Sequence, residues 1–165
     1  MARTRRSGIL LHPTSLPGPY GIGDLGPAAH RWADWVADAG CSLWQTLPLG
    51  PTGYGDSPYS CFSAFAGNPY LVSPDLLVAA GFLGPADLAD APEFPEDRVD
   101  YGRVIPWKLA LLDRAFDRMR SNPPEGAPER FVSFRRAQGG WLEDYALFMA
   151  LKDAQGGGAW AVWPA

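Results

Sequence analysis

The first fifty residues alternate short apolar runs with one stretch of helical periodicity. Residues 8–12 form an apolar run that stops at Pro13, which is typical of a strand buried on both faces of a parallel sheet. Residues 42–49 are a second run, rich in side chains that suit strands. Between them, apolar residues recur at helical spacing: Trp32, Trp35, Val36 and Ala39. This order predicts a parallel strand–helix–strand unit, with Asp24 as the N-cap of the helix and Gly40 at its end.

After the second strand the periodicity disappears and then returns as a helical repeat. Residues 50–69 form a predicted loop, and loops of that length inside compact domains usually carry function. From Val104 onward the pattern predicts three helices, and we expect the apolar face of the first to hold Leu109, Leu112, Phe116 and Met119. We therefore predict three parts: an α/β part at residues 1–82, a mostly helical insertion at 83–155 and a returning segment at 156–165.

Length and composition limit the classes of protein to consider. The 165 residues suffice for one ordinary core but not for a complete (β/α)8 barrel, which needs about 250. The net charge of −4 offers no clustered positive field for nucleic acid or an anionic membrane, and we interpret Arg3, Arg5 and Arg6 as a solvated terminus. No apolar run approaches a membrane helix or a signal-peptide core, so we expect a cytoplasmic protein. Cys41 and Cys61 are expected to be buried, reduced thiols without metal-ligand spacing.

The loop at residues 51–60 is the densest candidate for a ligand site. Gly53 and Gly55 let a ligand approach the backbone closely, and Pro58 holds the ring of Tyr59 on a stiff frame. Aromatic rings offer flat apolar surfaces to the C–H faces of a sugar, while serine, aspartate and backbone amides satisfy its hydroxyls. The composition alone fits a sugar-binding wall and a rigid turn whose tyrosines pack on the core equally well.

The strongest motifs of the chain are SGILLHPTSLP at residues 7–17, GIGDLG at 21–26, WQTLPLGP at 44–51 and GDSPYS at 55–60. They continue with NPY at 68–70, DYALF at 144–148 and the ending WAVWP at 160–164. In this order they resemble the 4-α-glucanotransferases of glycoside hydrolase family 77, also called amylomaltases or disproportionating enzymes. The resemblance covers essentially the whole chain. It implies an α/β fold, the start of a (β/α)8 TIM barrel with its first two strands and a helical insertion subdomain.

The resemblance also implies a reaction, the transfer of α-1,4-glucan segments between maltodextrin chains in cytoplasmic maltodextrin or glycogen metabolism. The mechanism would be retaining: a carboxylate forms a covalent glycosyl-enzyme, which a sugar hydroxyl then resolves. The partners would be maltooligosaccharides, amylose or glycogen, with no organic cofactor and no metal. The family's nucleophile, acid/base glutamate and stabilising aspartate lie on later barrel strands. We therefore expect no catalytic residue in this chain and no transfer activity from it alone.

Matched residue by residue, the resemblance assigns Tyr59 to stacking on the sugar at the cleavage point. It assigns Ser57 and Gly55 to the lining of the donor subsites. Tyr54 and Tyr101 match aromatic residues that some members use in an accessory glucan site. These five residues are the substrate-binding positions that the sequence predicts.

Two aspartates close to the motifs have explanations that do not require catalysis. Asp24 has a sufficient role as a helix cap, and Asp56 is expected to order its own turn through an Asx-type bond. Two other functions are compatible with the residues present: a non-catalytic glucan-binding protein and a hydrolase of the α-amylase type. The aromatic ending at residues 160–164 has nothing after it to pack on, so we expect the chain to stop within a domain.

Overall fold

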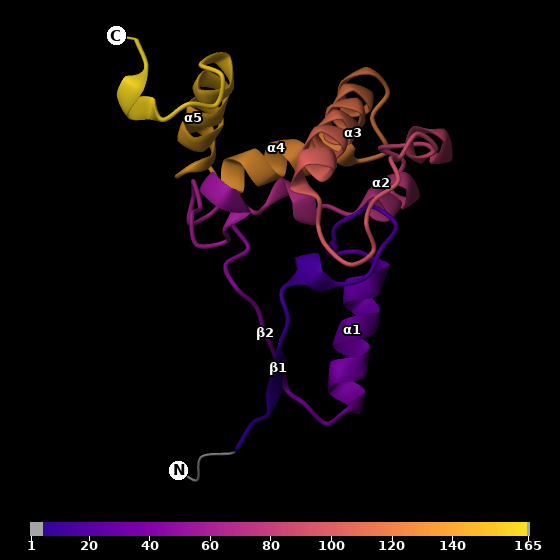
Figure 1. Cartoon of the computed structure of the whole chain (residues 1–165). Coiled ribbons are helices and arrows are strands. Elements are labelled where there is room, and N and C mark those ends of the chain that lie inside the picture. Colours follow the sequence, from indigo (N-terminus) through magenta and orange to yellow (C-terminus); the bar gives the residue numbers. More distant parts are fainter. Residues whose placement is uncertain (1–4, 165) are drawn as a thin grey trace. The chain divides into compact units, whose positions relative to one another are not determined.

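The computed structural model of the protein describes residues 5–164, so Arg3 of the predicted basic start lies outside the described residues. The chain forms two compact units, Met1–Pro124 and Glu125–Ala165. The first unit contains these strands and helices (Figure 1): β1 Gly8–Leu10, α1 Pro27–Asp38, β2 Leu43–Gln45, α2 Pro74–Ala79 and α3 Tyr101–Ser121. The second contains α4 Ala127–Ala137 and α5 Leu142–Ala154. The predicted division at residues 82 and 155 stays a prediction.

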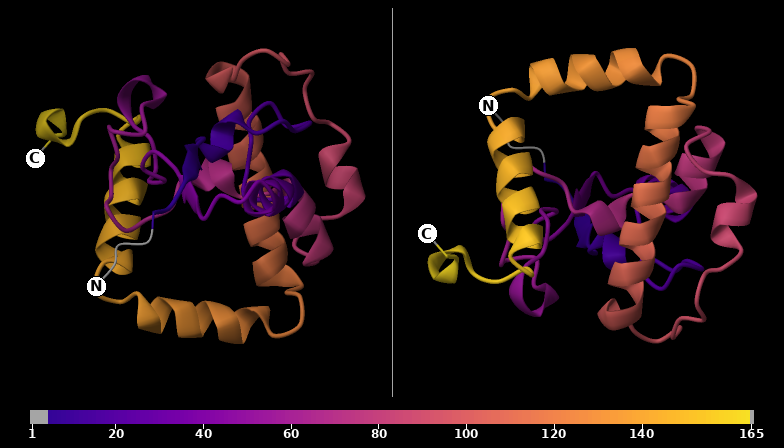
Figure 2. Two further views of the ribbon diagram at one scale, coloured as in Figure 1. Left: turned by 90° about the horizontal axis from the view of Figure 1, so that it is seen from below. Right: turned by 90° about the horizontal axis from the view of Figure 1, so that it is seen from above.

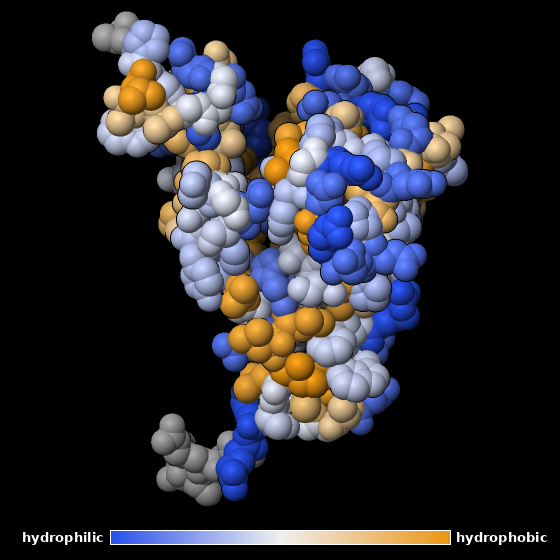
Figure 3. All heavy atoms as spheres, viewed as in Figure 1, coloured by the Kyte–Doolittle hydropathy of each residue, from blue (hydrophilic) through white to orange (hydrophobic). Residues whose placement is uncertain are grey.

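β1 and β2 pair in parallel and α1 connects them, so the predicted strand–helix–strand unit is confirmed. Both strands are shorter than the predicted runs. The prediction that the first strand is buried on both faces is wrong for this chain, because Leu10 is 55% exposed; Leu43 in β2 is likewise 46% exposed. Parallel strands usually belong to larger sheets whose two faces are both covered. In the described residues the sheet consists of only these two strands, so parts of it are exposed. Figure 3 shows the resulting hydrophobic surface over the strand pair.

The turn that leads into α1 differs from the prediction. Gly26 is the N-cap, and Asp24 lies two residues before it. The Asp24 carboxylate accepts a hydrogen bond from the Gly26 backbone N–H at 2.9 Å, so it orders the approach to the helix rather than capping it. The predicted end of the helix is confirmed, since Gly40 follows it with a φ of 75°.

The core of the first unit is centred on α3, which begins at Tyr101, earlier than the predicted Val104. Trp107 stacks on Tyr20 with ring centroids 5.5 Å apart, and Phe94 packs edge-on against it at 5.7 Å. The buried face of α3 consists of Val104, Trp107, Lys108, Leu111 and Ala115. The predicted apolar face is therefore wrong, because its Leu109 and Phe116 are exposed. Figure 2 shows α3 beside the 3-10 turn Pro69–Leu71 (η3), which it contacts.

The second unit is a helical segment with its own contacts. Arg135 on α4 pairs with Glu143 on α5 at 2.7 Å. Phe148 on α5 stacks on Trp163, with ring centroids 5.9 Å apart. The helices predicted from the periodicity in this part of the chain are confirmed.

Cys41 and Cys61 are free thiols, and both are half-buried rather than fully buried as predicted. Neither therefore contributes a covalent link to the fold. None of the helices in the described part of the chain combines the length and apolar character needed to cross a membrane.

Candidate functional site

The loop that follows β2 is closed by hydrogen bonds between its two ends. Thr52 and Cys61 form an antiparallel bridge, and the Phe62 N–H donates to the Pro51 carbonyl at 3.2 Å. Inside this closure the chain forms the 3-10 turn Tyr54–Asp56 (η2). The loop therefore has a defined shape although its sequence has no periodicity.

Two glycines make this shape possible. Gly55 has a φ of 66°, a conformation that side chains disfavour. A Cβ at residue 53 would lie 2.7 Å from the Ser60 carbonyl oxygen, closer than such atoms can approach. The sequence suggested that these glycines let a ligand approach the backbone. The structure shows that Gly53 is also required for the loop to close on itself.

The tyrosine rings of the loop are exposed. Tyr54 is 95% exposed and Tyr59 is 73% exposed, which does not agree with a rigid turn whose tyrosines pack on the core. The Ser57 hydroxyl accepts a hydrogen bond from the Tyr59 backbone N–H at 3.3 Å, so Ser57 orients the backbone that carries this ring. Tyr59 also borders a cavity of about 480 Å³, together with Phe62 and Ser63. A cavity of this volume is within the range of small-ligand sites.

The charge of Asp56 acts on two tyrosines from other elements, Tyr70 in η3 and Tyr101 at the start of α3. Burial raises the pKa of both phenols, and the negative charge of Asp56 raises the pKa of each further. The Asp56 backbone has a φ of 54°, which is uncommon outside glycine. The predicted Asx-type bond is not formed: within residues 5–164 the Asp56 side chain makes no hydrogen bond to its own turn. The charge of Asp56 thus couples the loop electrostatically to Tyr101 and to Tyr70.

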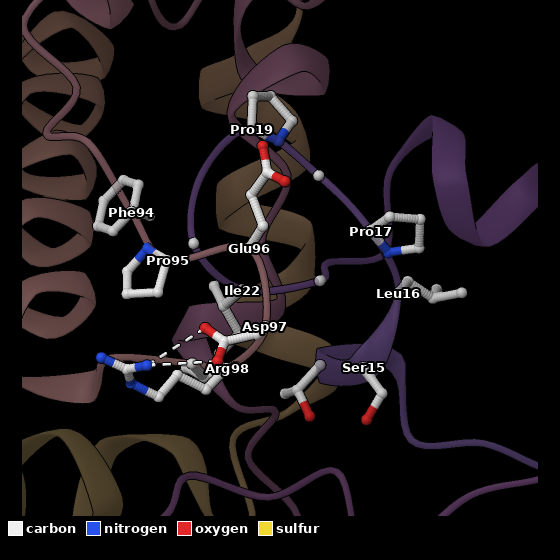
Figure 4. Close-up of a pocket in the computed structure, with 15 residues that line it drawn as sticks. Ser15, Leu16, Pro17, Pro19, Ile22, Phe94, Pro95, Glu96, Asp97 and Arg98 are labelled. Carbon is white, nitrogen blue, oxygen red and sulfur yellow. Dashed lines mark hydrogen bonds and ion pairs between the residues drawn. The ribbon is translucent and has the colours of Figure 1, made fainter.

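A second cavity, of about 720 Å³, lies between the segment after β1 and the segment before α3. Figure 4 shows Leu16 and Pro17 on one side of it and Phe94 on the other. Asp97 and Arg98 at its rim are exposed and pair with each other at 3.2 Å. The Phe94 ring already packs on Trp107, so this cavity lacks a free aromatic surface for a sugar. We therefore assign the candidate site to the loop after β2.

The chemistry of the loop is that of binding. Exposed rings, the Ser57 hydroxyl and backbone amides suit a neutral ligand with many hydroxyls. The described residues contain no group of three or more histidine, cysteine, aspartate or glutamate side chains placed to hold a metal ion. Asp24, the other aspartate considered, lies 3.8 Å from the Lys108 ammonium, and burial raises the pKa of its carboxyl. Its position in a buried ion pair agrees with a structural role.

Sequence reasoning missed two residues near this site, Tyr70 and Lys108. Tyr70 belongs to the NPY motif, but nothing in the local sequence shows that η3 approaches the loop. Lys108 left a clearer signal, because it occupies a buried position of α3 between Val104 and Leu111. A lysine at helical spacing between apolar residues indicates either a wrong choice of face or a buried charge, and here both are true.

A family model, related sequences and a solved structure all point to the same family. The family model described as 4-alpha-glucanotransferase, of glycoside hydrolase family 77, matches residues 11–165. The chain is 52% identical to a 4-alpha-glucanotransferase of Synechocystis sp. and 51% identical to one of Thermus thermophilus, in each case over 99% of this chain and 32% of the relative. It superposes on the amylomaltase of Streptococcus agalactiae in complex with acarbose with a TM-score of 0.90, at 36% identity, covering 98% of this chain and 32% of the other. The chain thus spans about a third of the length of these relatives.

Proposed function

The chain belongs to glycoside hydrolase family 77, the 4-alpha-glucanotransferases, and on this basis we propose that it is the N-terminal part of such an enzyme. Its contribution is one wall of the glucan-binding cleft, formed by the loop after β2. The parallel pair β1–β2 is the start of a (β/α)8 barrel. In such barrels the loops after the strands carry the active site, which is where this loop lies in the chain order.

The observation that carries the proposal is the exposure of Tyr54 and Tyr59 on a loop that is closed at its base. An exposed aromatic ring leaves apolar surface in contact with water, which is unfavourable unless a partner covers the ring. A glucan offers apolar C–H faces that match such rings, and hydroxyls that Ser57 and the loop amides can bind. A closed loop loses little conformational freedom on binding, which favours affinity.

Within the transfer reaction, Tyr59 stacks on the glucosyl unit at the cleavage point, and Ser57 and Gly55 line the donor subsites. Tyr54 and Tyr101 form an accessory contact for a longer glucan. A retaining transfer needs a carboxylate nucleophile and an acid/base carboxyl group about 5 Å apart. The rest of the enzyme supplies these groups, so the 165-residue chain binds and orients a glucan without cleaving it.

The substrates that fit this wall are maltooligosaccharides, amylose and glycogen. The corresponding role is the exchange of glucan segments in maltodextrin or glycogen metabolism. The cytoplasmic location that we expect from the sequence stays a prediction.

The proposal is tested by titrating maltoheptaose into the 165-residue chain by isothermal calorimetry. We expect binding that weakens about tenfold in the Tyr59→Ala variant, equivalent to about 1.4 kcal/mol. Tyr59→Phe keeps the ring and should bind within a factor of three of the wild type. Phe116→Ala, which removes an exposed ring from α3, is the matched control and should leave the affinity unchanged.

Incubation of the same chain with maltotriose tests whether it binds a glucan without cleaving it. We expect neither glucose nor longer maltodextrins. Product formation would contradict the assignment of the catalytic carboxylates to the rest of the enzyme. If the Tyr59→Ala and Phe116→Ala variants bind maltoheptaose with the same affinity, the assignment of the wall to this loop is contradicted.

A further inference from the structure

Lys108 is a charged side chain in the interior of the first unit. Its side chain is 1% exposed and lies on the buried face of α3 among apolar neighbours. The ammonium group donates a hydrogen bond to the Tyr70 backbone carbonyl at 2.7 Å, and the Asp24 carboxylate lies 3.8 Å away. Burial lowers the pKa of Lys108 to about 8, since the attraction of Asp24 offsets the loss of hydration only in part.

Two side chains fix both backbone polar groups of Tyr70, one from α3 and one from the N-cap of η3 itself. Lys108 holds the carbonyl, and the Asn68 side-chain oxygen accepts a hydrogen bond from the Tyr70 N–H at 2.9 Å. Asn68 is itself buried, and its backbone N–H donates to the Leu49 carbonyl after β2 at 2.8 Å. The position of Tyr70 is therefore set by α3 on one side and by the strand segment on the other.

Stability alone does not explain this arrangement. Apolar side chains of similar volume often stabilise a core as well as a buried ion pair does, or better. A methionine at residue 108 would fill the same space, but it could not donate to the Tyr70 carbonyl. The feature that only a long donor such as lysine provides is the attachment of η3 to α3.

We propose that Lys108 is a positioning residue for glucan binding: by holding the Tyr70 carbonyl against α3, it anchors the end of the loop at Asn68, whose backbone N–H closes on the Leu49 carbonyl at the loop's start, and so fixes the loop that carries Tyr54 and Tyr59. The inference rests on the proposed function of this loop. Asp24 has a secondary role in it, because its carboxylate neutralises the buried ammonium and orders the turn at Gly26. The Lys108 side chain thus connects α3 to the turn before α1, through Asp24, and to η3 at the end of the loop, through Tyr70.

The test separates positioning from stability by means of two variants of the 165-residue chain. Lys108→Met leaves the Asp24 charge buried without its partner, so we expect a large fall in the urea midpoint and weaker binding of maltoheptaose. Asp24→Asn/Lys108→Met removes both charges, and the amide oxygen introduced at residue 24 still accepts from the Gly26 N–H. We expect the double variant to recover most of the urea midpoint while its dissociation constant stays about tenfold above that of the wild type.

A control and a ligand-free measurement complete the experiment. Arg114→Met removes a charge from α3 that pairs with Asp87 and Asp90, and it should leave the affinity unchanged. Nuclear magnetic resonance of ¹³C-labelled tyrosine should show the pKa of Tyr70 and Tyr101 moving toward the ordinary value in the double variant, because Asp56 moves with the released loop.

Wild-type affinity and unchanged tyrosine titrations in the double variant would overturn the inference and leave the proposed function intact. Absence of binding by the wild-type chain would overturn the proposed function, and with it the role of Lys108 in glucan binding. Weak binding combined with a recovered urea midpoint and shifted titrations is the result that supports the inference.

Discussion

Raising the pH from 7 to 10 should stabilise the first unit, because Lys108 is buried in its charged form. Burial lowers the pKa of this ammonium from 10.5 to about 8. Between these two values the folded chain binds fewer protons at Lys108 than the unfolded chain does, so the free energy of unfolding rises with pH. The free energy of unfolding should rise by about 2–3 kcal/mol between pH 7 and pH 10. Solvent screening reduces this rise little, since the side chain is 1% exposed.

The assay is urea unfolding at pH 7, 8, 9 and 10, followed by near-ultraviolet circular dichroism, which reports on the packing of Trp107 and Tyr20. The Asp24→Asn/Lys108→Met variant is the reference, because it removes the buried Lys108–Asp24 pair and retains all the remaining titrating groups. We expect the free energy of unfolding of the wild type to rise by about 2–3 kcal/mol relative to this variant across the range. A difference that stays constant or falls with pH would refute the reasoning that burial dominates over the pairing with Asp24.

Above pH 10 the tyrosines reverse the trend. Burial is the main reason that the pKa values of Tyr20, Tyr70 and Tyr101 are raised, and the negative charges of nearby aspartates add to it. An acid whose folded-state pKa is raised contributes stability that is present below its ordinary pKa of about 10 and is lost as the pH rises further. The stability of the wild-type chain should therefore pass through a maximum near pH 10.

Three substitutions test other parts of the account. Tyr20→Phe removes a hydrogen bond of 2.6 Å to the exposed Asp75 carboxylate and should lower the free energy of unfolding in urea by about 1 kcal/mol. Leu111→Ala opens a cavity in the core around α3 and should cost about 2–5 kcal/mol in the same measurement, whereas an unchanged midpoint would contradict the position of the core. Gly53→Ala forces a Cβ against the Ser60 carbonyl, so calorimetry should show maltoheptaose binding at least about tenfold weaker with little change in the urea midpoint.

The local signals in the sequence predicted the elements well where one pattern had one explanation. The strand–helix–strand order and the stop of α1 at Gly40 follow from periodicity and glycine chemistry, and both are confirmed. The buried face of α3 could not be predicted in the same way. Apolar residues lie at helical spacing on two of its faces, and tertiary contacts with Tyr20 decide which face is buried.

The candidate site could be predicted to the level of the loop but not of its supports. Glycine, proline and tyrosine identify the segment that carries Tyr54 and Tyr59, because these residues act locally. The electrostatic coupling of Tyr70 and Tyr101 to Asp56 depends on how η3 and α3 pack, and no local pattern encodes it. The exposure of β1 and β2 could not be predicted either. An apolar run indicates that a strand is suited to burial, but it does not show whether other elements cover the strand.

The most direct test of the account places this chain in the context of a complete enzyme. In a chimera, residues 1–165 replace the matching region of the Thermus thermophilus relative, which is 51% identical to them. Glucose release from maltotriose then measures transfer. We predict activity within about tenfold of the parent enzyme, and a loss of at least about tenfold in kcat/KM when Tyr59→Ala is added to the chimera. A folded chimera without transfer activity, or one that is indifferent to Tyr59→Ala, would contradict the claim that this chain supplies the glucan-binding wall.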